Sequence, residues 1–141
     1  MERVVIHNDG SYLIEVDNFV RSICDTYHIG NYYATISVPV MDAVKKSMGL
    51  QDDSIQQSEV EVFFDYDVRG VCFHINGTKG CFHSDDLLLI RMLCDQVYVS
   101  NDYSQIELSF AIRGIDCNEA AQRVATLEHF FHPKSVEVLQ A

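Results

Sequence analysis

The chain has 141 residues and a net charge of −11, because 21 Asp and Glu residues outnumber 10 Lys and Arg residues. Apolar residues make up 48% of the sequence, which is enough for one domain with an ordinary packed core. An acidic surface repels the phosphates of nucleic acids and of anionic lipids, so binding to either is not expected, whereas a basic protein partner would suit it.

Nothing in the sequence predicts a membrane-bound or secreted protein. No run of 18 apolar residues is present, and the first residues lack the long apolar stretch of a signal peptide. The cysteines are odd in number, and four of the five lie in or beside apolar segments (the five are Cys24, Cys72, Cys81, Cys94 and Cys117). We therefore expect free, buried thiols and a cytoplasmic location rather than a disulfide framework.

The first third of the chain predicts a short strand followed by two amphipathic helices. Residues 3–7 are β-like and end at an Asn-Asp-Gly turn, after which Ser11 can cap a helix that stops near Gly30. The apolar stripe of this helix is Val16, Val20, Ile23 and Tyr27. The apolar face of the second helix, over residues 31–49, is Tyr33, Ile36, Val40, Val44 and Met48. Pro39 either kinks this helix or marks its first turn, with residues 32–38 in another form.

The rest of the chain alternates between strand and helix signals. After a polar loop at residues 50–58, two apolar/polar alternations predict an antiparallel hairpin (Val60, Val62, Phe64 and Tyr66, then Val71, Phe73 and Ile75). A glycine-containing loop follows at residues 76–83, and Ser84 with two acids predicts a helix start. Residues 87–93 are apolar almost all round, so that helix should be deeply buried. Residues 97–99 and 106–112 predict a final hairpin.

This order of elements predicts an α/β fold. We expect a two-layer α/β sandwich, in which helices cover one face of a mixed, mainly antiparallel sheet. The domain should comprise residues 1–113 and be followed by a C-terminal helical extension over residues 114–141. Asp116 and Glu119 have capping-box spacing at the start of that extension. Such an appended amphipathic helix could make a homodimer.

The series of two helices, polar loop, hairpin, glycine-containing loop, buried helix and final hairpin resembles a known domain. It is similar to the ATPase domain shared by histidine kinases, gyrase-type ATPases and anti-sigma-factor serine kinases, the GHKL or Bergerat fold. The best-matching segment is Leu87–Val99, and the short anti-sigma kinases match best in length. The resemblance implies ATP and Mg²⁺ chemistry. In the family this chemistry needs a catalytic acid and a magnesium-binding Asn on the second helix. It also needs an Asp after the third strand that binds the adenine amino group, and glycine-rich turns that bind the phosphates.

The chain departs from this pattern at each of those places. Asp42 matches the catalytic acid, but Lys46 stands where the magnesium Asn should be. Asn76 falls where the adenine-reading Asp should be, and an amide accepts a hydrogen bond more weakly than a carboxylate does. Thr78 replaces one glycine of that motif, while Gly80 matches another.

The phosphate turn is altered as well. Asp85-Asp86-Leu87-Leu88 replaces the glycine-rich sequence, and two carboxylates would repel phosphate there. The resemblance therefore implies a regulatory, protein-binding domain of the anti-sigma type that has lost ATP binding and kinase activity. Its partner would be a sigma factor or an anti-anti-sigma protein, and no cofactor is expected. An active ATP-dependent serine/threonine kinase using Asp42, Lys46, Asn76 and Gly80 is one alternative, and a small-molecule-binding module on the same scaffold is another.

Two weaker patterns were weighed as metal sites. His129 and His132 have helical i, i+3 spacing that could bind a metal, but a favourable interaction with the C-terminal dipole of a helix is the plainer account. A second set of possible N and S ligands is Cys72, His74, Cys81 and His83. The chain has no paired C-x-x-C motif, so no metal site is expected.

Overall fold

A five-stranded sheet and the helices that pack on it form the described part of the chain. The computed structural model describes residues 2–49, 59–83, 87–113 and 115. The elements follow in the order β1 (Glu2–His7), α1 (Tyr12–Thr26), the 3₁₀ turn η1 (Gly30–Tyr32), α2 (Tyr33–Ser47), β2 (Glu59–Asp67), β3 (Gly70–Asn76), α3 (Leu88–Leu93), β4 (Gln96–Val99) and β5 (Gln105–Ala111). The prediction of an α/β fold is thus confirmed.

The strand order across the sheet is β1-β2-β3-β5-β4, and every pairing is antiparallel. An antiparallel sheet was predicted, but the expected parallel component is not found among these strands. Two helices, rather than one, connect β1 to β2, so the chain returns in the opposite direction. Strands β3 and β4 do run parallel to each other, but β5 lies between them and pairs with both.

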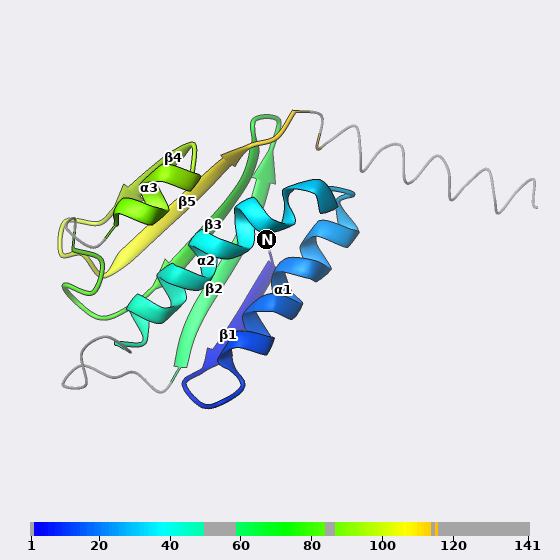
Figure 1. Ribbon diagram of the computed structural model, residues 1–141. Coiled ribbons are helices and arrows are strands. Elements are labelled where there is room, and N and C mark those ends of the chain that lie inside the picture. The colour runs from blue at the N-terminus through cyan, green and yellow to red at the C-terminus, as the bar shows by residue number, and fades with distance from the viewer. Residues whose placement is uncertain (1, 50–58, 84–86, 114, 116–141) are drawn as a thin grey trace, which may run out of the picture.

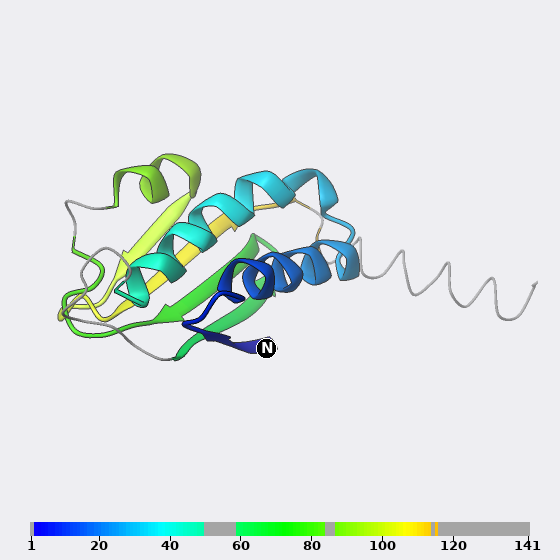
Figure 2. The same cartoon turned by 60° about the horizontal axis from the view of Figure 1, so that its bottom comes forward.

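The described helices lie on the same face of the sheet (Figures 1 and 2). Helices α1 and α2 lie side by side across it, and α3 lies over its β4 end and contacts α2. The strand residues that face the helices are buried (Val60, Val62, Phe64, Val71, Phe73, Ile75, Ile106, Leu108 and Phe110). They meet the apolar stripes of α1 and α2, where Val16, Val20, Ile23, Ile36, Val40, Val44 and Met48 are buried as their periodicity predicts.

Helix α1 begins where the sequence predicts, with Ser11 as its N-cap residue. The Ser11 side chain, however, does not cap the helix. Its hydroxyl donates instead to the carboxylates of Asp9 and Glu15, the latter at 2.8 Å. The Nδ1 atom of His7 also lies 3.1 Å from the Glu15 carboxylate, so these side chains stabilise the turn between β1 and α1.

Helix α2 runs through Pro39 without stopping, from Tyr33 to Ser47. Pro39 therefore does not mark the first turn, and the residues before it are helical. A proline at this position removes one backbone donor and crowds the preceding turn, which normally disfavours a helix interior. Here Pro39 is buried beside the buried Val40, so packing against the core offsets that penalty.

Helix α3 is shorter and less buried than predicted. It begins at Leu88, with Leu87 as its N-cap, and only one side of it faces the core. Leu87 and Ile90 are buried, but Leu88 and Met92 are 70% and 72% exposed. The prediction of a deeply buried helix is wrong because apolar composition does not say how many neighbours surround a helix, and α3 packs at one end of the helical layer.

Several predictions fall on residues that are not described. The polar loop at 50–58, the helix start at 84–86 and the extension from residue 116, with His129 and His132, lie outside the described residues. Of the cysteines, Cys24, Cys72, Cys81 and Cys94 are free thiols. The described helices include none that combines the length and the apolar character needed to cross a membrane.

Candidate functional site

The resemblance directs attention to the second half of α2, where Asp42 and Lys46 lie one helical turn apart. Residues four apart lie on the same side of a helix, and here the two side chains meet. The Lys46 ammonium donates to the Asp42 carboxylate, with 2.8 Å between Nζ and Oδ2. Only 8% of the Lys46 side chain and 18% of the Asp42 side chain are exposed. The two predicted site residues of α2 thus form a largely buried ion pair.

The end of α2 meets the loop after β3 at Gly77. A Cβ atom on Gly77 would lie 3.1 Å from the Ser47 Cβ atom and 2.4 Å from the Cys81 sulfur. Ser47 is fully buried, and its hydroxyl donates to the carbonyl of Val44 at 2.7 Å. Since no side chain fits at Gly77, the loop backbone packs directly on the helix, next to the turn that carries Lys46.

The same loop is held on its other side by backbone hydrogen bonds to the β4–β5 turn. The amides of Gly77, Gly80 and Phe82 donate to carbonyls of that turn at 2.7, 2.8 and 2.9 Å. Gly80 has φ +85°, a left-handed conformation that favours glycine, and Phe82 is fully buried. These three N–H groups are therefore engaged within the protein, whereas a phosphate-binding loop presents such groups to its ligand.

Asn76 points away from Asp42 and Lys46. It is the last residue of β3, pairs with Gln105, and follows the buried Ile75, so the strand pleat turns its side chain to the face without helices. There its amide oxygen lies 3.0 Å from the Nε2 atom of His74. The next residue, Gly77, occupies the position that faces α2.

The possible ligands Cys72, His74 and Cys81 do not gather at one point. Cys72 lies on the face of the sheet without helices and donates to Glu107, with 3.1 Å between sulfur and oxygen. The Cys81 sulfur instead lies at Gly77, beside α2. Burial raises the pKa of the Cys81 thiol to about 11, so it is neutral near pH 7. Among the residues that the structure describes, no group of three or more potential ligands could hold a metal ion.

The structure thus brings Asp42 and Lys46 together, places Gly80 in the loop that packs on the end of α2, and turns Asn76 to the face of the sheet opposite Asp42 and Lys46. Sequence reasoning did not single out Gly77. A signal for it was present, because Phe73 and Ile75 alternate inward and Gly77 continues that alternation. A signal for the Asp42–Lys46 pair was present as well, in the i, i+4 spacing of opposite charges, but sequence reasoning matched the two residues only to motif positions.

No protein-family model matches the chain, and no curated protein sequence matches it either. The arrangement of the described residues is therefore the basis for the function proposed below.

Proposed function

We propose that this chain is a regulatory protein-binding domain of the anti-sigma type, built as a two-layer GHKL-like sandwich, that no longer binds ATP or phosphorylates a partner. The element order supports the proposal. A strand, two helices, a hairpin, a loop, a helix and a final hairpin follow one another as the resemblance implies. Fold alone does not assign function, so the site carries the argument.

The ion pair between Asp42 and Lys46 is the observation that carries the proposal. In the family the acid is free to activate a nucleophile, and the residue one turn later helps to hold Mg²⁺. Here an ammonium lies 2.8 Å from that acid. A magnesium ion brought to this position would be repelled by the lysine, and moving the lysine away would break a largely buried pair. Breaking such pairs costs several kcal/mol.

The neighbouring loop supports the same conclusion. Its Gly77, Gly80 and Phe82 amides already donate to the β4–β5 turn, so a nucleotide could use these N–H groups only if those hydrogen bonds broke. The inward position at the end of β3 is Gly77, which has no carboxylate to read an adenine amino group and no room for a larger side chain. Both observations support the proposal that the catalytic and base-reading functions of a GHKL site have been lost.

An exposed apolar surface on α3 is where a protein partner could bind. Three apolar side chains of α3 are exposed: Leu88 at 70%, Leu89 at 45% and Met92 at 72%. They lie on one side of the helix. Contiguous exposed apolar side chains are typical of protein–protein interfaces. On this proposal the domain acts in the cytoplasm and uses this surface to hold a sigma factor or an anti-anti-sigma protein.

Titration with a fluorescent ATP analogue and Mg²⁺ tests the loss of nucleotide binding. We expect no saturable binding to the full chain. Saturable micromolar binding that Asp42→Ala abolishes would instead support the active serine/threonine kinase. A thermal-shift screen against metabolites separates the third alternative, because a small molecule that binds the native state raises its melting temperature.

A pull-down from the source cell, analysed by mass spectrometry, tests the partner. We expect a sigma factor or an anti-anti-sigma protein, and we expect Leu88→Asp/Met92→Asp to lose it. Arg113→Asp, on an exposed residue outside α3, is the control and should retain the partner. Recovery of the same proteins by all three baits would count against α3 as the binding surface.

A further inference from the structure

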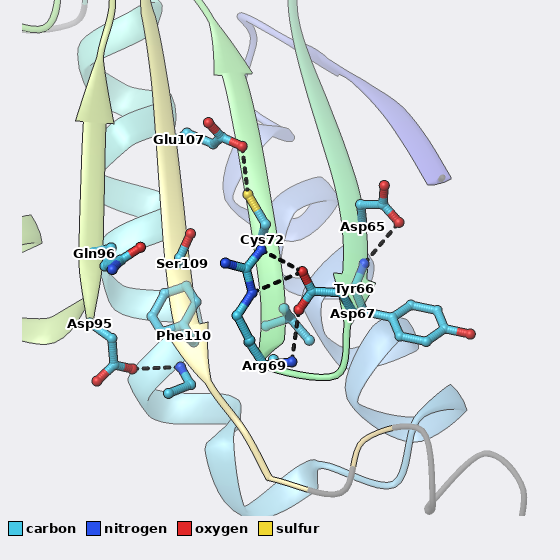
Figure 3. A pocket seen from close by; sticks show the side chains of 13 residues that line it. Asp65, Tyr66, Asp67, Arg69, Cys72, Asp95, Gln96, Glu107, Ser109 and Phe110 are labelled. Carbon is cyan, nitrogen blue, oxygen red and sulfur yellow. Dashed lines mark hydrogen bonds and ion pairs between the residues drawn. The ribbon is translucent and has the colours of Figure 1, made fainter.

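The face of the sheet opposite the helices carries a hollow that no described element covers. It extends across β2, β3, β5 and β4 and has a volume of about 530 Å³. Figure 3 shows its side chains, with Cys72 and Ser109 in the middle and Glu107, Asp65 and Asp95 around them. Register explains this gathering, because Asp65, Cys72, Ser109 and Gln96 pair in turn across the four strands.

Each of three carboxylates in the hollow accepts a hydrogen bond through one of its two oxygens. Asp65 accepts from the Tyr66 amide at 2.9 Å, and Asp95 accepts from the Ala111 amide at 2.6 Å. Glu107 accepts from the Cys72 thiol at 3.1 Å. The other oxygen of each has no protein partner among the described residues, so the hollow presents oriented acceptors.

Two arginines on this face are already engaged. Arg3 pairs with Glu61 at 2.6 Å, and Arg69, at the rim of the hollow, pairs with Asp67 at 2.9 Å. In the described part of the chain Asp65, Asp95 and Glu107 form no ion pair. The hollow therefore keeps a local negative charge that a cation from outside could neutralise.

An aromatic ring adjoins the carboxylates. Tyr98 is directly opposite Glu107 in the β4–β5 pairing, on the same face of the sheet, and is 63% exposed. An arginine side chain combines a planar cation that binds carboxylates through two N–H groups with a surface that stacks on aromatic rings. A bare metal ion would need several ligands at one point, and the described residues provide no such group.

From this charge complementarity and the neighbouring ring, we propose that the hollow docks an arginine side chain from a basic segment of a partner protein. The arginine would pair with Glu107 and stack on Tyr98, which is opposite Glu107 on the neighbouring strand, while Asp65, two strands away from Glu107, adds negative charge to the hollow. This surface lies on the opposite face from Asp42 and Lys46, so it does not depend on the loss of nucleotide binding. It would give the domain a second contact, separate from α3, for a partner whose charge is opposite to its own.

The test is an NMR titration of the ¹⁵N-labelled full chain with the peptide Thr-Arg-Thr-Arg-Thr in physiological salt and EDTA. The matched peptide carries citrulline, which has nearly the same shape without the charge. We expect saturable shifts at the amides around Cys72, Ser109 and Gln96 with the arginine peptide and none with the citrulline peptide. Shifts that spread evenly over the acidic surface, or that are absent with both peptides, would overturn the proposal.

Two double variants complete the test. Asp65→Asn/Glu107→Gln removes two charges from the hollow and should weaken arginine-peptide binding about tenfold. Asp25→Asn/Glu2→Gln removes two exposed charges elsewhere and should change the affinity less than about twofold. Equal weakening by both would show non-specific charge attraction and refute the site. Circular dichroism of each variant confirms that it is folded.

Discussion

The ammonium of Lys46 lies 2.8 Å from the carboxylate of Asp42 one turn earlier on α2, and both side chains are largely withdrawn from solvent. On the proposed resemblance to GHKL ATPases, this pair falls at the positions of the catalytic acid and the magnesium-binding residue. A charge pair that satisfies itself stabilises the helix but leaves neither group available to a nucleotide.

Removing one member of the pair should destabilise the protein more than removing both. Asp42→Asn leaves a largely buried ammonium without its counter-ion and should lower the free energy of unfolding by about 3 kcal/mol. The double variant Asp42→Leu/Lys46→Met replaces both charges with apolar groups and should remain within about 1 kcal/mol of the wild type. Urea denaturation measures both. Glu61→Gln, in an ion pair whose side chains are 55% and 41% exposed, is the control and should cost less than about 1 kcal/mol.

The close packing of Gly77 on α2 predicts a marked glycine effect. Gly77→Ala places a methyl group 2.4 Å from the Cys81 sulfur and 3.1 Å from the Ser47 Cβ atom, so the Cys81 side chain must rotate and the loop and α2 must move apart slightly. Overpacking of this kind costs about 1–3 kcal/mol. Gly10→Ala is the matched control, since nothing lies within 4 Å of its Cβ position. Equal midpoints for the two variants would show that the loop does not pack on α2 in this way.

His7 should titrate above its ordinary pKa. The hydrogen bond to Glu15 and the negative charge of Glu15 raise the pKa of His7 above 6.5. Burial acts to raise the pKa of Glu15, but the hydrogen bonds from Ser11 and His7 outweigh it, so the pKa of Glu15 is lowered. Since the folded-state pKa of the histidine is the higher one, its contribution to stability is complete below about pH 6.5 and is lost as the pH rises through the raised value. NMR titration of the imidazole measures the shift. In Glu15→Gln the histidine should return towards its ordinary pKa, and an unchanged value would contradict the pairing.

The thiol of Cys72 should react slowly and respond to Glu107. Burial first, and then the hydrogen bond and negative charge of Glu107, raise the pKa of Cys72 to about 12, so almost no thiolate exists at pH 8. Glu107→Gln removes the charge and should speed alkylation of Cys72 by iodoacetamide several-fold, as followed by peptide mass spectrometry. Cys94, whose pKa burial raises to about 12 and which does not contact Glu107, should keep its rate and serves as the internal control.

Periodicity predicted the buried faces of the fold because burial follows the repeat of the backbone. The stripe of Val16, Val20 and Ile23 and the alternation of Phe73 and Ile75 are both found in the core. Such patterns identify which side of an element faces inward, and they needed no knowledge of its neighbours. The exposure of α3 depends instead on how many elements surround it, which local composition cannot reveal.

The candidate site was predicted in part for a related reason. Asp42 and Lys46 lie four residues apart on one helix, a spacing that allows the two side chains to meet, although they were matched only to motif positions and the ion pair itself was not predicted. The motif after β3 depends on strand parity, and a shift of one residue turns a side chain to the opposite face. Asn76 was matched by motif spacing alone, whereas the pleat brings Gly77 to α2 and turns Asn76 towards His74. The hollow around Cys72 joins residues from four strands, and no local pattern signals it.

The most direct test of the central proposal is a titration of the ¹⁵N-labelled full chain with ATP and Mg²⁺, observed at the amides of α2 and of the Gly77–Phe82 loop. We predict that no saturable change occurs at millimolar nucleotide, because Lys46 holds Asp42 and the loop amides are already bonded to the β4–β5 turn. Saturable shifts centred on Asp42 and Gly77, lost in Asp42→Ala, would contradict the account and support an active nucleotide-binding domain.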